Sequence, residues 1–242
     1  MKTSSRNDAG FSLVELLMAM TLSLTVMGFG SALLASSFNV RSREDRKSDA
    51  VADVQRALNI MTRELSNSGF RVPSGLASVS PNGIVAADSD NQSVRIIANL
   101  NGMPNADPAL TDTDVSDVDE DVKFLMYVDN ALSQRYLVRY ERNATNQTTV
   151  LANRVDSLIF RYYDEKVTYQ TTLDDQGVCD ITNVKNASGN LESEVSPAVA
   201  KYIVIAVGVT LPEVGSPGAP GYQRRTSVQL TSDVVLRNSI VY

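Results

Sequence analysis

The reactive side chains of this 242-residue chain are almost all carboxylates, because it contains no His and a single Cys. The absence of His excludes Ser–His and Cys–His nucleophile pairs and every metal site that uses imidazole. The single Cys179 excludes an intramolecular disulfide and a Cys-x-x-Cys redox pair. Its sequence context predicts a polar loop with acids nearby, which does not activate a thiol. What remains is carboxylate chemistry, oxygen-ligated metals, or assembly without chemistry.

The densest group of acids lies between residues 107 and 121, where there are seven carboxylates and no Lys or Arg. Calcium prefers six to eight oxygen ligands, and clustered Asp side chains can supply several of them. An EF-hand loop starting at Asp112 would need Gly at its sixth position and Glu at its twelfth, but the chain has Asp117 and Lys123 there. The other interpretation is a solvated acidic loop before a strand. The candidate calcium ligands are Asp112, Asp114, Asp117 and Asp119.

Catalysis by carboxylates and binding of nucleic acid are both disfavoured. A glycosidase needs two acids that converge in a cleft, and no pair in the sequence indicates one. The formal net charge is −6, with 28 acidic and 22 basic residues and no long Lys/Arg run. A nucleic-acid partner requires a basic face that neutralises phosphates. We therefore expect a protein that is not an enzyme, has no cofactor other than a hypothetical calcium ion, and binds no nucleic acid.

A run of 25 residues from Leu16 to Val40 contains no charged side chain. As a helix it would span about 37 Å, which exceeds the roughly 30 Å of a hydrocarbon core. A buried core helix of this length without a polar face is uncommon. An ordinary secretory signal has an apolar segment of only about 7–15 residues. The run predicts a membrane-spanning helix, and Glu15 at its head predicts a partner that neutralises the carboxylate.

The residues before this run carry a specific motif. A short basic leader ends in Gly10, and Phe11-Ser12-Leu13-Val14-Glu15 leads into the apolar helix. This arrangement resembles the prepilin leader of type IV pilins and type II secretion pseudopilins. The resemblance implies that a prepilin peptidase cuts between Gly10 and Phe11 and methylates the new amino group. It also implies that the apolar helix stays on the mature protein.

The physical properties of these residues suit those roles. Gly10 has no side chain and can enter a tight peptidase site in an extended conformation. Cleavage creates an ammonium group on Phe11, and Glu15 of the same or a neighbouring subunit can pair with it. Removing either partner would leave an isolated charge in a medium of low dielectric constant. The pairing would set the register of an incoming subunit.

The rest of the chain resembles PilW-type minor pilins and J-type minor pseudopilins. The resemblance is carried by Arg63-Glu64-Leu65 before Ser68-Gly69-Phe70, by the acidic lead-in to the segment 122–127, and by the closing Val235-Leu236-Arg237-Asn238. Major pilins often carry a C-terminal disulfide loop, which a single Cys forbids. The resemblance implies a minor pilin that initiates a pilus or lies at its tip. Two alternatives stay open: a minor pseudopilin of a type II secretion system, and a signal-anchored β-domain protein that does not assemble.

The resemblance also implies partners and a location. The partners would be other pilin subunits, through the N-terminal helix, and the prepilin peptidase. The protein would cross the bacterial inner membrane once, with a periplasmic domain, and would then move to the pilus at the cell surface. Adhesion and motility are the activities that such a location would serve.

These features define four segments and an α+β fold. Residues 1–10 are the leader, 11–40 the transmembrane helix, 41–68 its amphipathic continuation, and 69–242 a β-rich domain. The continuation carries one apolar stripe at spacings of three and four, and we expect it to end before a left-handed Gly69. The stripe consists of Val51, Val54, Leu58, Met61 and Leu65.

After Gly69 the apolar period changes to two, which predicts a mainly antiparallel sheet. The segment 201–211 is apolar on both faces and is expected to be a central strand. Asp129-Asn130 is expected at a hairpin corner, and Gly215–Gly221 to be a flexible connection before the last strand. The expected strands are 94–98, 122–128, 136–140, 158–163, 201–211 and 227–236.

Overall fold

The structure is a computed structural model that describes residues 12–73, 76, 78–101, 114–174, 176–219 and 221–239. The chain divides into two compact units. The first comprises residues 1–45 and 213–224, and the second comprises 46–212 and 225–242. The leader 1–10, Phe11 and Asp112 lie outside the described residues.

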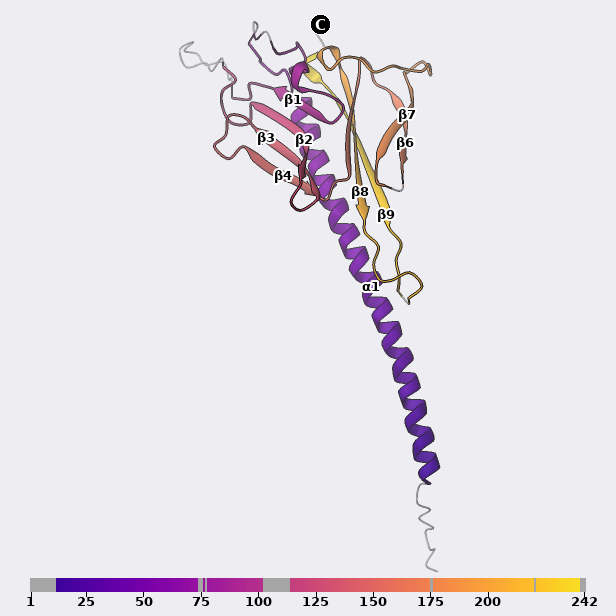
Figure 1. Cartoon of the computed structure of the whole chain (residues 1–242). Helices are drawn as coiled ribbons and strands as arrows, with labels where there is room; N and C mark the ends of the chain where they lie inside the picture. The colour runs from indigo at the N-terminus through magenta and orange to yellow at the C-terminus, as the bar shows by residue number, and fades with distance from the viewer. Residues whose placement is uncertain are drawn as a thin grey trace, which may run out of the picture. The chain divides into compact units, whose positions relative to one another are not determined.

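One helix, α1, runs from Leu13 to Ser66 and belongs to both units (Figure 1). The first proline of the chain is Pro73, so nothing removes an intrahelical hydrogen bond within α1. Gly28 and Gly30 are both helical, although Gly lowers the stability of a helix in water. This confirms the prediction of a single long helix that continues from the apolar run into the amphipathic segment.

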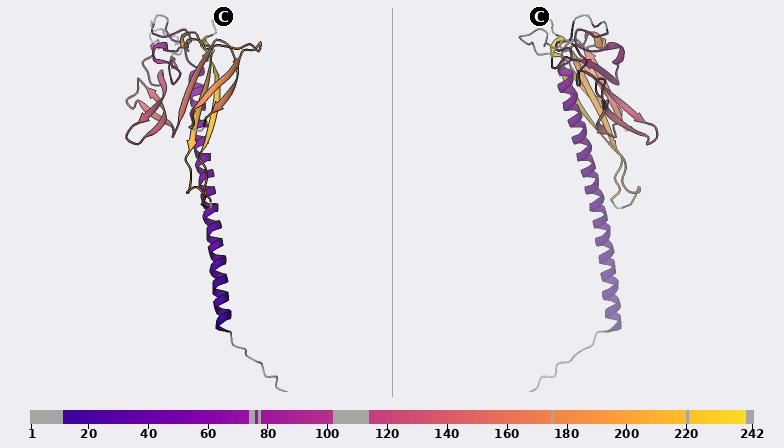
Figure 2. Two further views of the ribbon diagram at one scale, coloured as in Figure 1. Left: turned by 45° about the vertical axis from the view of Figure 1, so that its right-hand side comes forward. Right: turned by 90° about the vertical axis from the view of Figure 1, so that its left-hand side faces the viewer.

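The second unit holds two antiparallel sheets and a hairpin (Figures 1 and 2). The first sheet has the order β1-β2-β3-β4 and the second the order β5-β8-β9, while β6 and β7 pair with each other. The strands are β1 Ser93–Ile97, β2 Asp121–Asp129, β3 Gln134–Glu141, β4 Thr148–Asn153, β5 Ser157–Tyr163, β6 Thr168–Leu173, β7 Cys179–Lys185, β8 Tyr202–Leu211 and β9 Thr226–Val235. All pairs are antiparallel, which confirms the α+β fold class.

The core of the second unit forms where the apolar stripe of α1 meets both sheets. Val54, Leu58, Met61 and Leu65 are at most 1% exposed and belong to one cluster with residues of both sheets. Alternate residues of β8 face this cluster, and the others face a second cluster under the β6–β7 hairpin. The central position predicted for the segment 201–211 is therefore confirmed.

The end of α1 is fixed by two glycines. Gly69 has φ 78°, as predicted, and its amide donates to the carbonyl of Ile97 at 2.9 Å. Gly83 has φ 81°, and a Cβ on it would lie 1.9 Å from the amide nitrogen of Gly69. The two backbones touch because neither carries a side chain. Asn238 also donates to the carbonyl of Ser68 at 2.9 Å, so the helix end is tied to the last residues described.

The structure corrects the expectation for Cys179. It is not in a polar loop but begins β7, where it is fully buried. Its amide donates to Ser157 Oγ at 3.0 Å, and its Sγ lies 3.0 Å from the same oxygen. Burial raises the pKa of the thiol. We therefore still expect a thiol that is not activated, but the reason is its burial and not a polar loop with acids nearby.

Candidate assembly segment

The first turn of α1 holds Glu15, whose carboxylate turns back along the helix. The Ser12 amide donates to Glu15 Oε2 at 3.4 Å, and the Leu16 amide donates to the Ser12 carbonyl at 3.1 Å. Ser12 and Glu15 have the S-x-x-E spacing of a capping box, in which the acid reaches back to the amide of the residue that begins the helix. The sequence interpretation did not use this signal. The carboxylate of Glu15 is directed towards the start of α1. The predicted cut before Phe11 would make this end of the helix the N-terminus of the chain.

The two residues of the predicted cleavage site, Gly10 and Phe11, lie outside the described residues. The pairing of Glu15 with the ammonium group of Phe11 therefore stays a prediction. Glu15 itself is exposed, and a negative charge in the first turn is favourable because the helix dipole is positive there.

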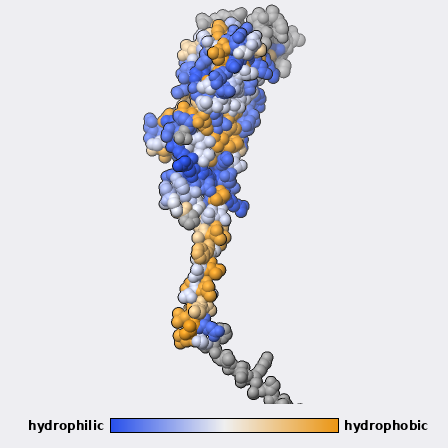
Figure 3. All heavy atoms as spheres, turned by 90° about the vertical axis from the view of Figure 1, so that its right-hand side faces the viewer, coloured by the Kyte–Doolittle hydropathy of each residue, from blue (hydrophilic) through white to orange (hydrophobic). Residues whose placement is uncertain are grey.

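The first half of α1 presents apolar side chains on its surface (Figure 3). No residue of its most apolar stretch is buried, and it is the helix among the described residues that is long and apolar enough to cross a membrane. Large side chains on every side are exposed, for example Leu17 at 56%, Leu24 at 67% and Leu34 at 60%. Such a surface requires lipid or other helices around it.

Three hydroxyl groups within this half are satisfied by the helix itself. Thr21 Oγ1 donates to the carbonyl of Met18 at 2.9 Å, Thr25 Oγ1 to Thr21 at 2.7 Å, and Ser31 Oγ to Met27 at 2.8 Å. A polar group without a partner is expensive in hydrocarbon, and these bonds remove that cost for the three side chains. These three residues are therefore compatible with an apolar surrounding.

A loop of the first unit packs against α1 where the apolar run ends. Arg43 is 7% exposed and donates from Nη1 to Gln223 Oε1 at 3.1 Å and from Nη2 to the carbonyl of Arg224. Gly221 lies so close that a Cβ on it would be 3.0 Å from Ser36 Cα. The connection between β8 and β9, expected to be flexible, thus has defined contacts with the helix. Val214 and Gln223 also form a β-bridge at its base.

The described calcium candidates lie in the loop before β2. Asp114 Oδ1 accepts from the Ser116 amide and hydroxyl, Asp117 from Asn101, and Asp119 from Arg139 Nη2. Within the described ranges, no three acidic, His or Cys side chains are placed to hold one metal ion. Calcium binding stays a prediction.

A buried ionic network, which the sequence did not indicate, joins α1 to β3. The Arg139 Nε lies 3.1 and 2.9 Å from the two oxygens of Glu64, and its Nη1 lies 3.3 Å from Glu141 Oε2. Arg139 and Glu141 side chains are 11% and 4% exposed. Burial raises the pKa of Glu64 and of Glu141, and the positive charge of Arg139 opposes this. The network fixes the amphipathic half of the helix on the first sheet.

A comparison with known families identifies a match to the prokaryotic N-terminal methylation motif over residues 5–31. The match covers the end of the leader, Gly10, Phe11, Glu15 and the first part of the apolar run. It supports a type IV pilin-like or pseudopilin chain, and it implies processing by a prepilin peptidase and anchoring in the membrane. Neither a curated protein nor a solved structure matches the chain.

Proposed function

We propose that this chain is a structural subunit of a type IV pilus, stored in the inner membrane and added to the filament after its leader is removed. The observation that carries the proposal is the methylation motif at the head of an unbroken apolar helix with exposed side chains. A helix of this kind can exchange lipid for neighbouring helices without unfolding. Assembly of the helix into the filament would then carry the β-rich domain to the cell surface.

In this proposal the chemistry is done to the chain and not by it. The peptidase cuts the bond between Gly10 and Phe11 and the amino group of Phe11 is methylated. The ammonium group then pairs with Glu15 of the subunit or of its neighbour. A subunit out of register would leave the carboxylate unpaired among apolar side chains, which costs several kcal/mol. Composition supports a structural role, since the chain has no His and one Cys that is buried.

The finer proposal is a minor pilin that initiates the pilus or caps it. The single Cys cannot form the C-terminal disulfide loop found in many major pilins. The periplasmic placement of the β-rich domain, its later exposure at the cell surface, and roles in adhesion or motility belong to the same proposal. A minor pseudopilin would use the same helix physics. Deletion of the gene separates the two, because a pilin subunit is needed for twitching motility and a pseudopilin for secretion of folded proteins.

The proposal is tested by removing the charge of Glu15 and measuring the chain in sheared surface filaments. We expect Glu15→Gln to be cleaved and stored in the membrane but to fall at least about tenfold in the filament fraction, because the ammonium group of Phe11 then lacks its partner. Glu44→Gln is the matched control: it removes an exposed acid from the same helix outside the apolar run. Equal amounts of both variants in filaments would contradict the proposal.

A further inference from the structure

A polar hollow of about 630 Å³ opens in the second unit at the ends of several strands. Three arginines from separate segments line it: Arg135 at the start of β3, Arg154 in the turn between β4 and β5, and Arg225 just before β9. Its lining also includes Asp156 and the polar side chains of Ser133, Gln134, Gln176 and Thr210. The hollow is therefore basic in a chain whose net charge is −6.

The three arginines differ from the other arginines of the two sheets in their partners. Arg95, Arg139 and Arg161 each form ion pairs with two or three carboxylates. Arg135, Arg154 and Arg225 form none with any carboxylate in the part of the chain that the structure describes.

Among the described residues, Arg135 and Arg225 have neutral acceptors instead, and Arg154 has no hydrogen-bond acceptor. Arg135 Nη1 donates to the carbonyl of Asp156 at 2.8 Å, and Arg225 Nη1 lies 3.5 Å from Gln176 Oε1. The carboxylate of Asp156 accepts from the Thr210 amide. Guanidinium groups with unused donors in a hollow are suited to carboxylates, which they bind with two parallel hydrogen bonds.

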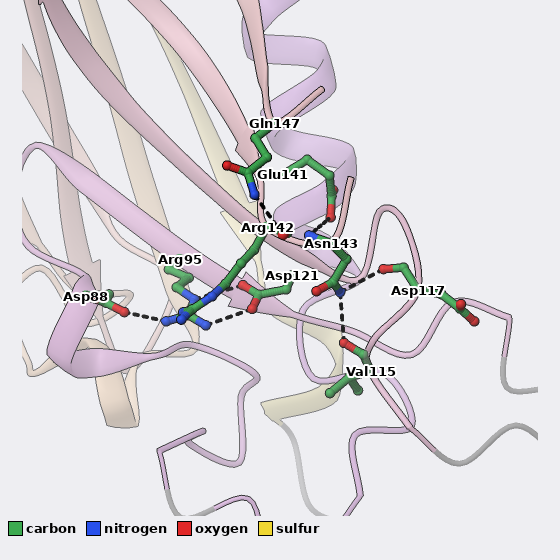
Figure 4. A network of polar contacts seen from close by, with 9 residues as sticks. All are labelled: Asp88, Arg95, Val115, Asp117, Asp121, Glu141, Arg142, Asn143 and Gln147. Atoms are coloured by element: carbon green, nitrogen blue, oxygen red, sulfur yellow. Dashed lines mark hydrogen bonds and ion pairs between the residues drawn. The ribbon is translucent and has the colours of Figure 1, made fainter. Parts of the chain in front are cut away.

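An acidic surface lies at the opposite end of the first sheet, where β2 begins and β3 ends. Residues 114–120 contain four acids and no base. Asn143, which follows β3, donates to the carbonyls of Val115 and Asp117 at 3.1 and 2.8 Å (Figure 4). The side chains of Asp114 and Asp117 are exposed, and hydrogen bonds from Ser116 hold the pKa of Asp114 below its ordinary value. We call residues 114–120 the acidic loop.

Two separate measures, one along β3 and one along α1, show that the hollow and the acidic loop lie far apart. The hollow begins at Gln134 and the loop is held beyond Glu141, which places them about 24 Å apart along β3. On the helix, Ala50 lies beside the end of β8, next to the hollow, whereas Glu64 contacts Arg139 near the loop. These helix positions are about 21 Å apart.

We propose that the basic hollow of one subunit binds the acidic loop of a second copy of this chain. The inference rests on the proposed function. In a filament of parallel helices, the end of one domain that carries the acidic loop would meet the end of the next domain that carries the hollow. The two surfaces are different and complementary in charge, so the contact is head-to-tail. Repetition of such a contact gives a helical assembly when its rotation does not close a ring. If two copies are adjacent in the complex that initiates the pilus, they would make two contacts. One is between their N-terminal helices, and the other is between the hollow and the acidic loop.

The test is a cross-link between two differently tagged full-length copies in the same cells. One copy carries Ser133→Cys at the rim of the hollow and the other carries Ser116→Cys in the acidic loop; both positions are exposed. We expect a short thiol cross-linker to join the two tags. A pair with Ser133→Cys in one copy and Lys185→Cys, an exposed residue of β7, in the other is the control and should give no such product.

Charge reversal makes the test specific. Arg154→Glu in the first copy should lower the cross-linked product about tenfold, and Asp117→Arg in the second copy should restore it. Lys166→Glu, at an exposed position in the turn after β5, should change nothing. Filaments that contain both copies but give no cross-link would overturn this inference and leave the proposed function intact. Loss of both copies from filaments under all conditions would overturn the two together. A product that Arg154→Glu does not reduce would also overturn it.

Discussion

The two halves of α1 have the same secondary structure but are stabilised in opposite ways. In the half from Leu13 to Val40, large apolar side chains are exposed on all sides, and three hydroxyl groups bond to the helix's own carbonyls. In the half from Val51 to Leu65, a single stripe is buried against two sheets and Arg139 binds Glu64. The apolar side chains of the first half therefore need other molecules to cover them, while those of the second half are covered by the sheets of the same chain. In the proposed function, the first half is the one that would exchange lipid for neighbouring helices of a filament.

The largest effect should follow from breaking the ionic network that fixes the second half. Arg139→Met leaves Glu64 and the nearly buried Glu141 without their positive partner, and we expect a loss of about 4 kcal/mol in the free energy of unfolding. Urea unfolding of the full chain in detergent, followed by the near-ultraviolet circular dichroism of its tyrosines, measures this. The first tyrosine is Tyr127, so none of the tyrosines lies in α1.

Arg56→Met is the control for that substitution. Its side chain is 70% exposed and pairs with Asp53 at 3.4 Å, so its removal should change the free energy of unfolding by less than about 0.5 kcal/mol. Equal effects of the two substitutions would contradict the role assigned to the network.

A matched pair of leucine truncations compares the halves directly. Leu58 is 1% exposed and Leu24 is 67% exposed. Leu58→Ala should lower the free energy of unfolding by about 3 kcal/mol because it leaves a cavity in the core. Leu24→Ala should change it by less than about 0.5 kcal/mol, since nothing in the domain packs on it. The same tyrosine signal measures both, and a large effect of Leu24→Ala would show that its half is part of the domain core.

The smallest effect is a pH dependence from Glu64. Burial raises its pKa in the folded state above 4.5, so the folded state binds more protons than the unfolded state above that pH. The free energy of unfolding should therefore fall as the pH rises from about 4.5 through the folded pKa, and Glu141 acts in the same direction. Glu64→Gln should make this fall shallower. Unfolding curves at several pH values between 4 and 8 measure the slope, and a steeper fall in the variant would contradict the sign.

The sequence predicted the parts of the fold that local periodicity controls. The apolar run and the stripe that ends at Leu65 predicted α1. Alternation and one continuous apolar segment, 201–211, predicted six of the strands, including the hairpin between β2 and β3. It missed β4, β6 and β7 because their exposed faces are rich in Thr, Gln and Asn and show little apolar alternation. The placement of Cys179 in a loop was wrong for the same reason.

The contacts that join distant segments could not be predicted from one sequence. Glu64 and Arg139 are 75 positions apart, and the arginines of the hollow come from three separate segments. Only the tertiary fold brings such residues together. The assembly segment differs, because its residues are adjacent in sequence and their spacing alone identified the motif that the family comparison found. Local signals were thus sufficient to predict processing and anchoring, and insufficient to predict the surfaces of the domain.

The central claim is that the first half of α1 is retained as the N-terminus of a mature subunit. The most direct measurement is the mass of the N-terminal peptide of the chain purified from its own cells. The account predicts a peptide that begins at Phe11 and carries one methyl group on its amino nitrogen. A chain that still begins at Met1, or one cut after the apolar run so that Glu15 is lost, would contradict it.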